Sequence, residues 1–575
     1  MSSSILKYVG LTWGWRSANA TQNVKGLVSE AGLDRLSKKH GFEGFWDGTF
    51  AAGVGTGKKT LFIGGSALEL SILFSEPDVV ESATLLFPES PDTVKKYAEG
   101  ASKILTDNLR LAPGQMTWTK EMDAFARNFE YLANLEKLGS SGLNLHEAIV
   151  GMYESLARLH SSEMDAARND PELKANYKQP ETYVMCSRSG IPAMNRRDTI
   201  GLTIDYWMDK HLKLPLPTPQ DEKYEKDNEN IRTIRIGCAP LTAINVGPVR
   251  ISDKWIGEEV VKAPVPGELA IGPVVNWLEP ENTFILNDQA KGGDQTAYSG
   301  PQLPQIGFQA AFEPPVPIPL SIWELIEGHG CGLPPLPPTT TLSSYDALIF
   351  PLPSVPGYDP MEARQINCFK TIFKPTAGAA VPPLRKSNIT RVTHQNVLLV
   401  YKPIYGRVLS EVTFSHPQQI ISILPYIRQY TLLRKLLETS FKEDKKETTP
   451  GADQPRVTTN CKGQKAIRKS NFDDFSDFME EPGSDEKPQP PRMDVTLMVH
   501  PMPRLQLVFP FKNRTADIVL EIRLNGVIHV ESENVLGPDN SKAPNGKTRT
   551  SQSLARILET CENLNTFCEY IRTKW

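Results

Sequence analysis

A glycine-rich segment near the N-terminus carries the residue types of a phosphate-binding loop. Residues 53–60 read GVGTGKKT, and in such loops backbone N–H groups cradle phosphates just before a lysine. Here Gly53 and Gly57 lie one residue too close together, and Lys59 stands where a Ser or Thr would bind Mg²⁺. The segment also leads into a strand-like run, and not into a helix whose N-terminus would attract phosphate. We therefore expect a flexible hairpin loop without nucleotide binding.

Three further segments contain nucleophiles or metal ligands, but each is incomplete. CSRSG at residues 186–190 lacks the first glycine of a nucleophile elbow, and His146-Glu147 lacks the second histidine of a zinc-protease helix. In GHGCG, residues 328–332, a histidine and a cysteine lie two residues apart with no second pair to complete a tetrahedral site. We expect no catalytic residue, no metal site and no cofactor, so the chain is predicted not to be an enzyme.

The composition indicates ordinary soluble, globular domains. Of 575 residues, 39% are hydrophobic and 23% charged, and the formal net charge is −4. These values give no bulk attraction to nucleic acid or to an anionic membrane, and we expect direct binding to neither. Seven cysteines without a C-x-x-C pair argue against a disulfide framework and favour a reducing compartment. No apolar run approaches about 18 residues, so no membrane span is predicted.

Residues 1–26 are expected to be a flexible N-terminus. They contain Lys7, Arg16 and Lys25 and no acidic residue, and MSSSILKYVGLTWGWRSANA ends in small residues. This composition resembles a weak targeting segment, secretory or mitochondrial. Because Lys7, Thr12 and Arg16 interrupt the apolar run, we favour a frayed or locally helical end.

The periodicity predicts an α+β, multi-domain fold in which hairpin-based sheets pack with amphipathic helices. In the first domain, residues 27–165, a helix over 33–40 precedes two strands. Apolar residues alternate over 68–74, and after the Glu76-Pro77-Asp78 turn the partner strand covers 82–87.

Three helices are predicted to complete this domain. Ser90 and Pro91 supply the N-cap and first position of one helix. Apolar residues at helical spacing over 122–133 mark the second, and Asn144 with Glu147 caps the third.

A β-rich domain is expected at residues 166–300. Strands at 182–190 and 198–209 are predicted to flank a turn at Gly190-Ile191-Pro192, and further strands are predicted at 231–238 and 249–251.

Residues 301–360 contain 14 of the 47 prolines. This is too many for a helix or for a central strand, so we expect a packed, extended connector or a sheet edge. P-P-L-P-P at 334–338 matches a polyproline II ligand of an SH3-like partner. The neighbouring Trp323, Leu325 and Leu333 favour burial instead.

The stretch from His416 to Glu438 is the longest amphipathic run between two β-like regions. It closes a segment, residues 361–440, that begins with strands at 397–401 and 408–414. Apolar residues recur at helical spacing on both sides of Pro425, which predicts a kinked helix or two short helices. Arg428 and Lys435 are expected on a solvated face.

The end of this helix, Leu433-Arg434-Lys435-Leu436-Leu437, matches the L-x-x-L-L motif that fills hydrophobic grooves on partner proteins. Leu433 and Leu437 continue the apolar stripe of Tyr426 and Tyr430. We therefore expect Leu433, Leu436 and Leu437 in the core, with partner binding as the alternative.

Residues 441–492 are rich in Lys, Glu, Asp, Thr, Pro and Gly and poor in aliphatics, which predicts a disordered linker. In NFDDFSDFMEE, residues 471–481, Phe472, Phe475 and Phe478 are spaced for one helical face among acids. This pattern suits folding into a basic-rimmed groove, so the three are candidate partner-binding residues. A solvated tether is the alternative.

Residues 493–575 are predicted to form a C-terminal β-hairpin and a closing helix. The hairpin turns at Asn525-Gly526. Apolar residues at helical spacing over 554–571 form one helix, in which Cys561 and Cys568 are expected to be core residues.

Several ordered blocks resemble one known family. SHPQQIISILPYIRQY, residues 415–430, is similar to the signature helix of the Mediator complex subunit 1 family, most closely its fungal branch. Five more blocks resemble that family in the same order: GLDRLSKKHGFEGFWD (32–47), KKTLFIGGSALELSILF (58–74), LLFPES (85–90), IDYWMDKH (204–211) and ISDKWIG (251–257). The resemblance runs over nearly the whole chain.

The resemblance implies a non-enzymatic subunit of the Mediator coactivator complex in the nucleus, which relays signals from DNA-bound transcription regulators to RNA polymerase II. The implied partners are other Mediator subunits, chiefly of the middle module, transcription regulators and, indirectly, the polymerase. Two alternatives stay open: an enzyme of unrecognised type that uses residues 53–60 or 328–332, and a mitochondrial protein addressed by its N-terminus.

Overall fold

The structure is a computed structural model that describes residues 26–48, 57–139, 143–171, 173, 179–209, 230–242, 246–262, 274–285, 302–338, 342–352, 359, 361–375, 389–442, 490–537 and 548–575. The chain forms two compact units. Unit 1 comprises Met1–Met361, Pro403–Arg434 and Ile522–Val527, and unit 2 comprises Glu362–Lys402, Lys435–Glu521 and Ile528–Trp575. Helices and strands occur in both units, which confirms the predicted α+β class. The division into seven segments stays a prediction.

Unit 1 begins with α1 (Glu30–Lys39) and a four-stranded antiparallel sheet. The strands, in spatial order, are β1 (Glu43–Asp47), β2 (Lys59–Gly64), β3 (Glu69–Glu76) and β4 (Val79–Leu86). The predicted alternation is confirmed, because Leu70, Ile72 and Phe74 are at most 1% exposed while the residues between them are partly exposed. The predicted hairpin of β3 and β4 is also confirmed.

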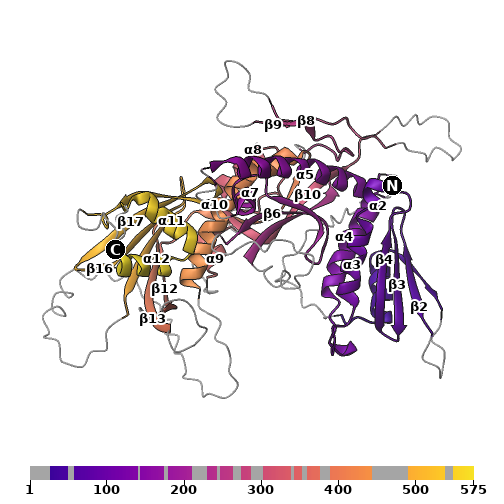
Figure 1. Cartoon of the computed structure of the whole chain (residues 1–575), viewed down its shortest axis with the longest axis horizontal. Coiled ribbons are helices and arrows are strands. Elements are labelled where there is room, and N and C mark those ends of the chain that lie inside the picture. The colour runs from indigo at the N-terminus through magenta and orange to yellow at the C-terminus, as the bar shows by residue number, and fades with distance from the viewer. Residues whose placement is uncertain are drawn as a thin grey trace, which may run out of the picture. The chain divides into compact units, whose positions relative to one another are not determined.

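Helices α3 (Ala98–Leu109) and α4 (Asp123–Gly139) lie along one face of this sheet, with a short 3₁₀ turn, η1 (Thr117–Thr119), between them. Helix α2 (Asp92–Lys95) precedes α3, and α5 (Leu145–Asn169) follows α4 and packs on α2 and α4. Figure 1 shows α3 and α4 packed along the same side of β2, β3 and β4. The predicted Asn144 cap is confirmed, since its Oδ1 accepts a hydrogen bond from the Glu147 N–H at 3.2 Å.

The single helix predicted after Ser90 is instead two. Pro91 is the N-cap of α2, and α3 begins after a break at Lys96-Tyr97. No side chain caps α2, so the predicted Ser90 cap is wrong. The Ser90 hydroxyl instead accepts a hydrogen bond at 2.9 Å from the amide of Asn144, which lies 54 positions away.

A six-stranded sheet forms the centre of unit 1. Its spatial order is β11-β14-β10-β7-β6-β5, and the strands are β5 (Ile191–Arg196), β6 (Thr199–Met208), β7 (Ile231–Pro240), β10 (Ile306–Pro319), β11 (Ser343–Ser344) and β14 (Tyr405–Phe414). A separate two-stranded sheet consists of β8 (Ile256–Val261) and β9 (Val275–Trp277). The predicted strand at 231–238 is confirmed, whereas residues 249–251 are not a strand.

The predicted strand at residues 182–190 is wrong. Residues Pro180–Ser187 form helix α7, with Pro180 in its first turn, a position that suits a residue without an N–H. The turn also lies elsewhere, because Arg196 pairs with Thr199 and Arg197 and Asp198 have positive φ values of 51° and 56°. Residues 191–196 are thus a strand and not the predicted turn.

The proline-rich segment contains an interior strand, β10, contrary to the prediction of a connector or edge. Pairing with β7 ends at Glu313, and pairing with β14 is irregular between Ala311 and Val316. Pro314 and Pro315 lie in that irregularity, where no ladder hydrogen bond needs their missing N–H groups. Two helices follow in the same segment: α8 (Leu320–Gly328) and α9 (Tyr345–Ile349).

Unit 2 contains the second six-stranded sheet. In spatial order its strands are β12 (Arg364–Pro375), β13 (Ile389–Val400), β15 (Arg492–Met498), β16 (Arg504–Phe511), β17 (Arg514–Arg523) and β18 (Val527–Glu533). β13 and β15 pair in parallel, and neither β12 nor β15 was predicted. At the turn between β17 and β18, Asn525 and Gly526 have φ values of 58° and 64°, which confirms the predicted two-residue turn.

The closing helix is divided into α11 (Ser551–Cys561) and α12 (Leu564–Lys574). Glu562 between them adopts a left-handed conformation with φ 44°, so the single helix predicted over 554–571 is wrong. Cys568 is 1% exposed, and Cys561 is half-buried. A new helix starts directly after Glu562, because the Asn563 side chain accepts a hydrogen bond from the Thr566 N–H. The apolar residues of α11 and α12 therefore keep a helical spacing on both sides of the break.

Candidate functional site

The predicted amphipathic stretch around Pro425 forms helix α10 (Pro417–Phe441). It is one helix that contains Pro425, so the alternative of two short helices is wrong. Buried residues recur along its whole length, and the following are at most 5% exposed: Ile420, Ile423, Leu424, Ile427, Arg428, Gln429, Tyr430, Thr431, Leu432, Leu433, Leu436, Leu437, Ser440 and Phe441. The helix is therefore a core element of the chain.

Arg428 is buried, and not on a solvated face as predicted. It is 1% exposed, and its guanidinium donates to three backbone carbonyls: Tyr206 O at 3.0 Å, Met185 O at 2.8 Å and Arg188 O at 2.6 Å. A fourth bond goes to Asn525 Oδ1 at 2.8 Å. Burial lowers the pKa of Arg428 to about 10, so the group stays charged at neutral pH. Arg428 thus joins α10 to α7, to β6 and to the Asn525 turn within unit 1.

The leucines of the L-x-x-L-L motif are also buried. Leu433, Leu436 and Leu437 are each 0% exposed. In this conformation none of them can reach a groove on another protein, because a groove-binding helix must present its leucines at the surface. The other candidate partner-binding residues, Phe472, Phe475 and Phe478, lie outside the residues that the structure describes.

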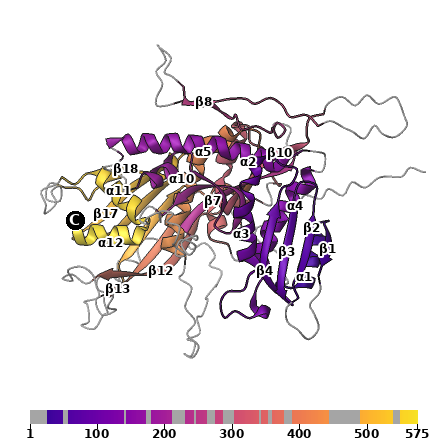
Figure 2. The same ribbon diagram turned by 45° about the vertical axis from the view of Figure 1, so that its right-hand side comes forward.

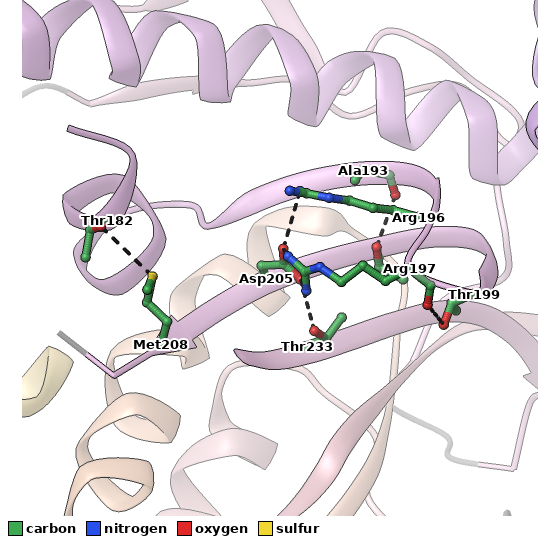
Figure 3. A network of polar contacts seen from close by, with 9 residues as sticks. Thr182, Ala193, Arg196, Arg197, Thr199, Asp205, Met208 and Thr233 are labelled. Atoms are coloured by element: carbon green, nitrogen blue, oxygen red, sulfur yellow. Dashed lines mark hydrogen bonds and ion pairs between the residues drawn. The ribbon is translucent and has the colours of Figure 1, made fainter. Parts of the chain in front are cut away.

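A second polar cluster holds the β5–β6 hairpin. Figure 3 shows Arg196, Arg197 and Thr233 converging on Asp205 of β6. Arg197 Nη1 donates to Asp205 Oδ1 at 3.0 Å, and Thr233 Oγ1 donates to the same oxygen at 2.9 Å. The Asp205 side chain is 2% exposed, so its charge is neutralised inside the protein and is not available to a substrate.

The elbow-like segment CSRSG offers no accessible nucleophile. Ser189 is 3% exposed, and its N–H donates to the Glu163 carboxylate at 3.0 Å. Burial raises the pKa of Glu163. His160, one helical turn away from Glu163, contacts the Gly190 carbonyl through Nδ1 at 3.1 Å and not the serine. The three residues therefore do not form a Ser-His-carboxylate relay.

Two further candidate residues, Lys59 and Cys331, are engaged within the chain or buried. Lys59 lies over the Trp46 ring at 4.1 Å and forms an ion pair with Glu30, while residues 53–56 lie outside the described part. Cys331 is 0% exposed, and burial raises its pKa to about 12, which keeps the thiol protonated. Among the described residues, no group of three or more His, Cys, Asp or Glu side chains is placed to hold a metal ion.

The proline segment 334–338 is held by the chain itself. Arg407 Nη1 donates to the carbonyls of Pro334 and Pro335 at 3.1 and 3.0 Å, and the same guanidinium lies 4.4 Å from the Trp323 ring centroid. An aromatic ring and a carbonyl-binding donor are also the groups by which polyproline-binding domains hold their ligands. An SH3-like partner would have to replace these contacts.

His146 lines a small cavity between α4, α5 and the β5–β6 hairpin. The cavity measures about 30 Å³, which is room for a water molecule and not for a cofactor. The ring lies 4.7 Å from the ring of Phe87, and Nε2 has no hydrogen-bond partner in the part of the chain that the structure describes. Burial lowers the pKa of His146 to about 4, so the imidazole is neutral in the folded protein.

His146 should make the stability of the folded state pH-dependent. Folding lowers the pKa of His146, so below about pH 6.5 the unfolded chain binds a proton that the folded chain does not. The free energy of unfolding therefore decreases as the pH is lowered. Between pH 7.5 and pH 5 the parent should lose about 2 kcal/mol more than His146→Phe. Thermal unfolding of both proteins across this range measures the difference. Equal pH profiles would show that the histidine titrates normally.

Comparison with known proteins decides the family. The model of the family described as Mediator of RNA polymerase II transcription subunit 1 matches residues 19–442. The chain belongs to the Mediator subunit 1 family. A comparison with curated proteins finds none that matches. Family membership makes the chain a Mediator subunit that takes part in transcription regulation and interacts with other Mediator subunits, and it implies a nuclear location. The family is one of non-enzymatic coregulators.

The Mediator subunit 1 match ends inside a folded unit. It includes β12 and β13, whose sheet is completed by β15 to β18 beyond residue 442. Residues 395–399 of β13 pair in parallel with residues 492–496 of β15. The C-terminal strands are thus part of the fold of this Mediator subunit, although the family model does not reach them.

Of the described helices of this Mediator subunit, none has the length and apolar character needed to cross a membrane.

Proposed function

We propose that this Mediator subunit belongs to the middle module and relays signals from DNA-bound transcription regulators to RNA polymerase II without catalysing a reaction. The observation that carries this proposal is the family match over residues 19–442. The burial of Ser189, Asp205 and Cys331 supports a role through surfaces, since a catalytic group must reach its substrate.

Affinity purification tests this proposal. The tagged full-length chain is expected to bring down middle-module Mediator subunits together with RNA polymerase II, and imaging is expected to place it in the nucleus. Elution alone, or with metabolic enzymes, would refute the proposal. Nucleotide binding by the purified chain would instead favour an enzyme that uses residues 53–60.

We further propose that Phe472, Phe475 and Phe478 form a helix that docks into a basic-rimmed groove of a partner. The proposal rests on their spacing among acids in a segment that is otherwise poor in apolar residues. Each phenylalanine that enters a groove could contribute about 1.5–3 kcal/mol, less the free energy needed to order the segment.

Replacing the three phenylalanines with alanine should weaken partner binding at least about tenfold and leave thermal stability almost unchanged. Titration of the partner and thermal unfolding measure the two effects. Thr458→Ala with Thr459→Ala, in the same linker, is the matched control and should bind like the parent. A lower unfolding temperature would mean that the rings pack on the chain's own domains, and full retention of partners would mean that the segment is only a tether.

A further inference from the structure

Two phenylalanines lie side by side on a face of the β1–β4 sheet that the described residues leave exposed. Phe45 and Phe62 are register partners in neighbouring strands, with ring centroids 6.5 Å apart. Their exposed fractions are 66% and 43%, and Leu86 on the same face is 50% exposed. Figure 2 shows the sheet with α3 and α4 on its other side. Apolar groups gathered on an exposed face mark an interaction surface.

The outer face, defined here as the side of the β1–β4 sheet opposite α3 and α4, contains a gap between two carboxylates. Gly64 pairs with Glu43 on one side and with Glu69 on the other. A Cβ added at Gly64 would meet no atom of the described residues within 4 Å. Because strands lie about 4.8 Å apart, the two glutamates flank an open space roughly 10 Å wide at the backbone, next to Phe62 on the same strand.

The charge on this outer face is negative. Asp47 is a third exposed acid there, in line with Phe45 along β1. The described strand positions on this face carry no lysine or arginine, since Lys59 points to the opposite face, where it pairs with Glu30. Lys58, just before β2, already pairs with Glu81 at 2.7 Å. The exposed rings are therefore bordered by acids whose charge a partner must complement.

The edge strand β4 is less available for binding a partner than the outer face is. The Ala83 and Leu85 N–H groups donate to the hydroxyls of Thr106 and Ser102 on α3, at 2.9 and 2.8 Å. Helix α3 thus satisfies these two outward N–H groups of β4, which otherwise would be free to pair with an added strand. Binding through side chains on the outer face is favoured over strand addition at β4.

We propose that the outer face binds a basic amphipathic segment of another Mediator subunit. The apolar side of that segment packs on Phe45 and Phe62, and one of its lysine or arginine side chains enters the space over Gly64 between Glu43 and Glu69. The aliphatic stem of such a side chain can lie against the Phe62 ring while its charged end meets the carboxylates. An acidic segment, including residues 471–481 of this chain, is disfavoured by like-charge repulsion. The inference rests on the proposed function only in naming a Mediator subunit as the source.

Site-specific photo-crosslinking in the assembled complex tests the inference. The full-length chain carries p-benzoylphenylalanine in place of Phe62, and mass spectrometry identifies the crosslinked peptide. The peptide is expected to come from another Mediator subunit and to contain more lysine and arginine than aspartate and glutamate. The double variant Glu43→Lys, Glu69→Lys should lower the crosslink yield at least about tenfold, because the outer face then repels a basic partner.

Two controls separate binding from folding. Glu324→Lys with Glu327→Lys, at exposed positions on α8, makes the same charge change and should leave the yield unchanged. Phe45→Thr keeps a strand-forming residue and should also lower the yield, while both variants of the outer face unfold at the temperature of the parent. A crosslink to an acidic segment, to a second copy of the chain or to no protein would overturn the inference.

The same sample also reports on the proposed function. If Mediator subunits co-purify but residue 62 gives no crosslink, the inference fails and the proposed function stands. If residue 62 crosslinks to a basic segment of a protein outside Mediator, the chemistry of the surface stands and its proposed source is wrong.

Discussion

Replacing Arg428 with methionine should destabilise unit 1 by about 3–5 kcal/mol. Methionine fills much of the aliphatic volume but donates no hydrogen bond, so three buried carbonyls and the Asn525 side chain lose their donor. An orphaned buried acceptor costs about 1–3 kcal/mol. Because the chain contains two units and a single unfolding midpoint need not describe it, amide hydrogen exchange in α7, β6 and α10 is the suitable measurement.

The geometry of the guanidinium distinguishes this network from a simple positive charge. Arg428→Lys keeps the charge but has one donor nitrogen in place of three, so it should recover only part of the loss. Arg110→Met, at an exposed arginine after α3, is the matched control and should exchange like the parent. Parent-like protection in Arg428→Met would show that water or another side chain satisfies the carbonyls.

Replacing Leu433 with alanine should cost about 2–5 kcal/mol of unfolding free energy, because the side chain is 0% exposed and its removal leaves a cavity in the core. The loss should appear in the isolated chain, without any partner protein. Urea unfolding together with hydrogen exchange of α10 measures it. Leu433→Met conserves volume and should cost less than about 1.5 kcal/mol.

The outcome that contradicts this prediction is specific. If Leu433→Ala is as stable as the parent but no longer binds one partner, the L-x-x-L-L motif is presented to that partner in solution. A motif that is only a core element should lose binding in proportion to its loss of folded protein.

Local sequence patterns predicted the structure correctly where one face of an element contacts water and the other packs on the core. The alternation in β3, the Asn144 cap and the Asn525-Gly526 turn each follow from neighbouring residues, and all three were predicted correctly. The strand prediction was wrong at residues 182–187, because Val184, Met185 and Cys186 form a short apolar run that suits a buried strand and a buried helix equally. Their burial at 1% or less shows why no polar face revealed the period.

Prolines and charges misled the prediction for a different reason. The rule that a central strand excludes proline assumes pairing on both sides at every residue, whereas β10 pairs on one side only near Pro317. The rule that an arginine marks a solvated face assumes no buried acceptors. At Arg428 the acceptors come from residues about 100 to 240 positions away, and no local pattern contains them.

By itself, the sequence determined the α+β class, the resemblance to the Mediator subunit 1 family and the incomplete state of each catalytic motif, because these depend on local periodicity and on ordered residue blocks. The tertiary structure decided which groups are accessible. It placed Arg428 among backbone carbonyls and left Phe45 and Phe62 uncovered beside Glu43 and Glu69. Accessibility depends on contacts between residues far apart in the chain, and burial of a side chain is set by those contacts rather than by its neighbours in sequence.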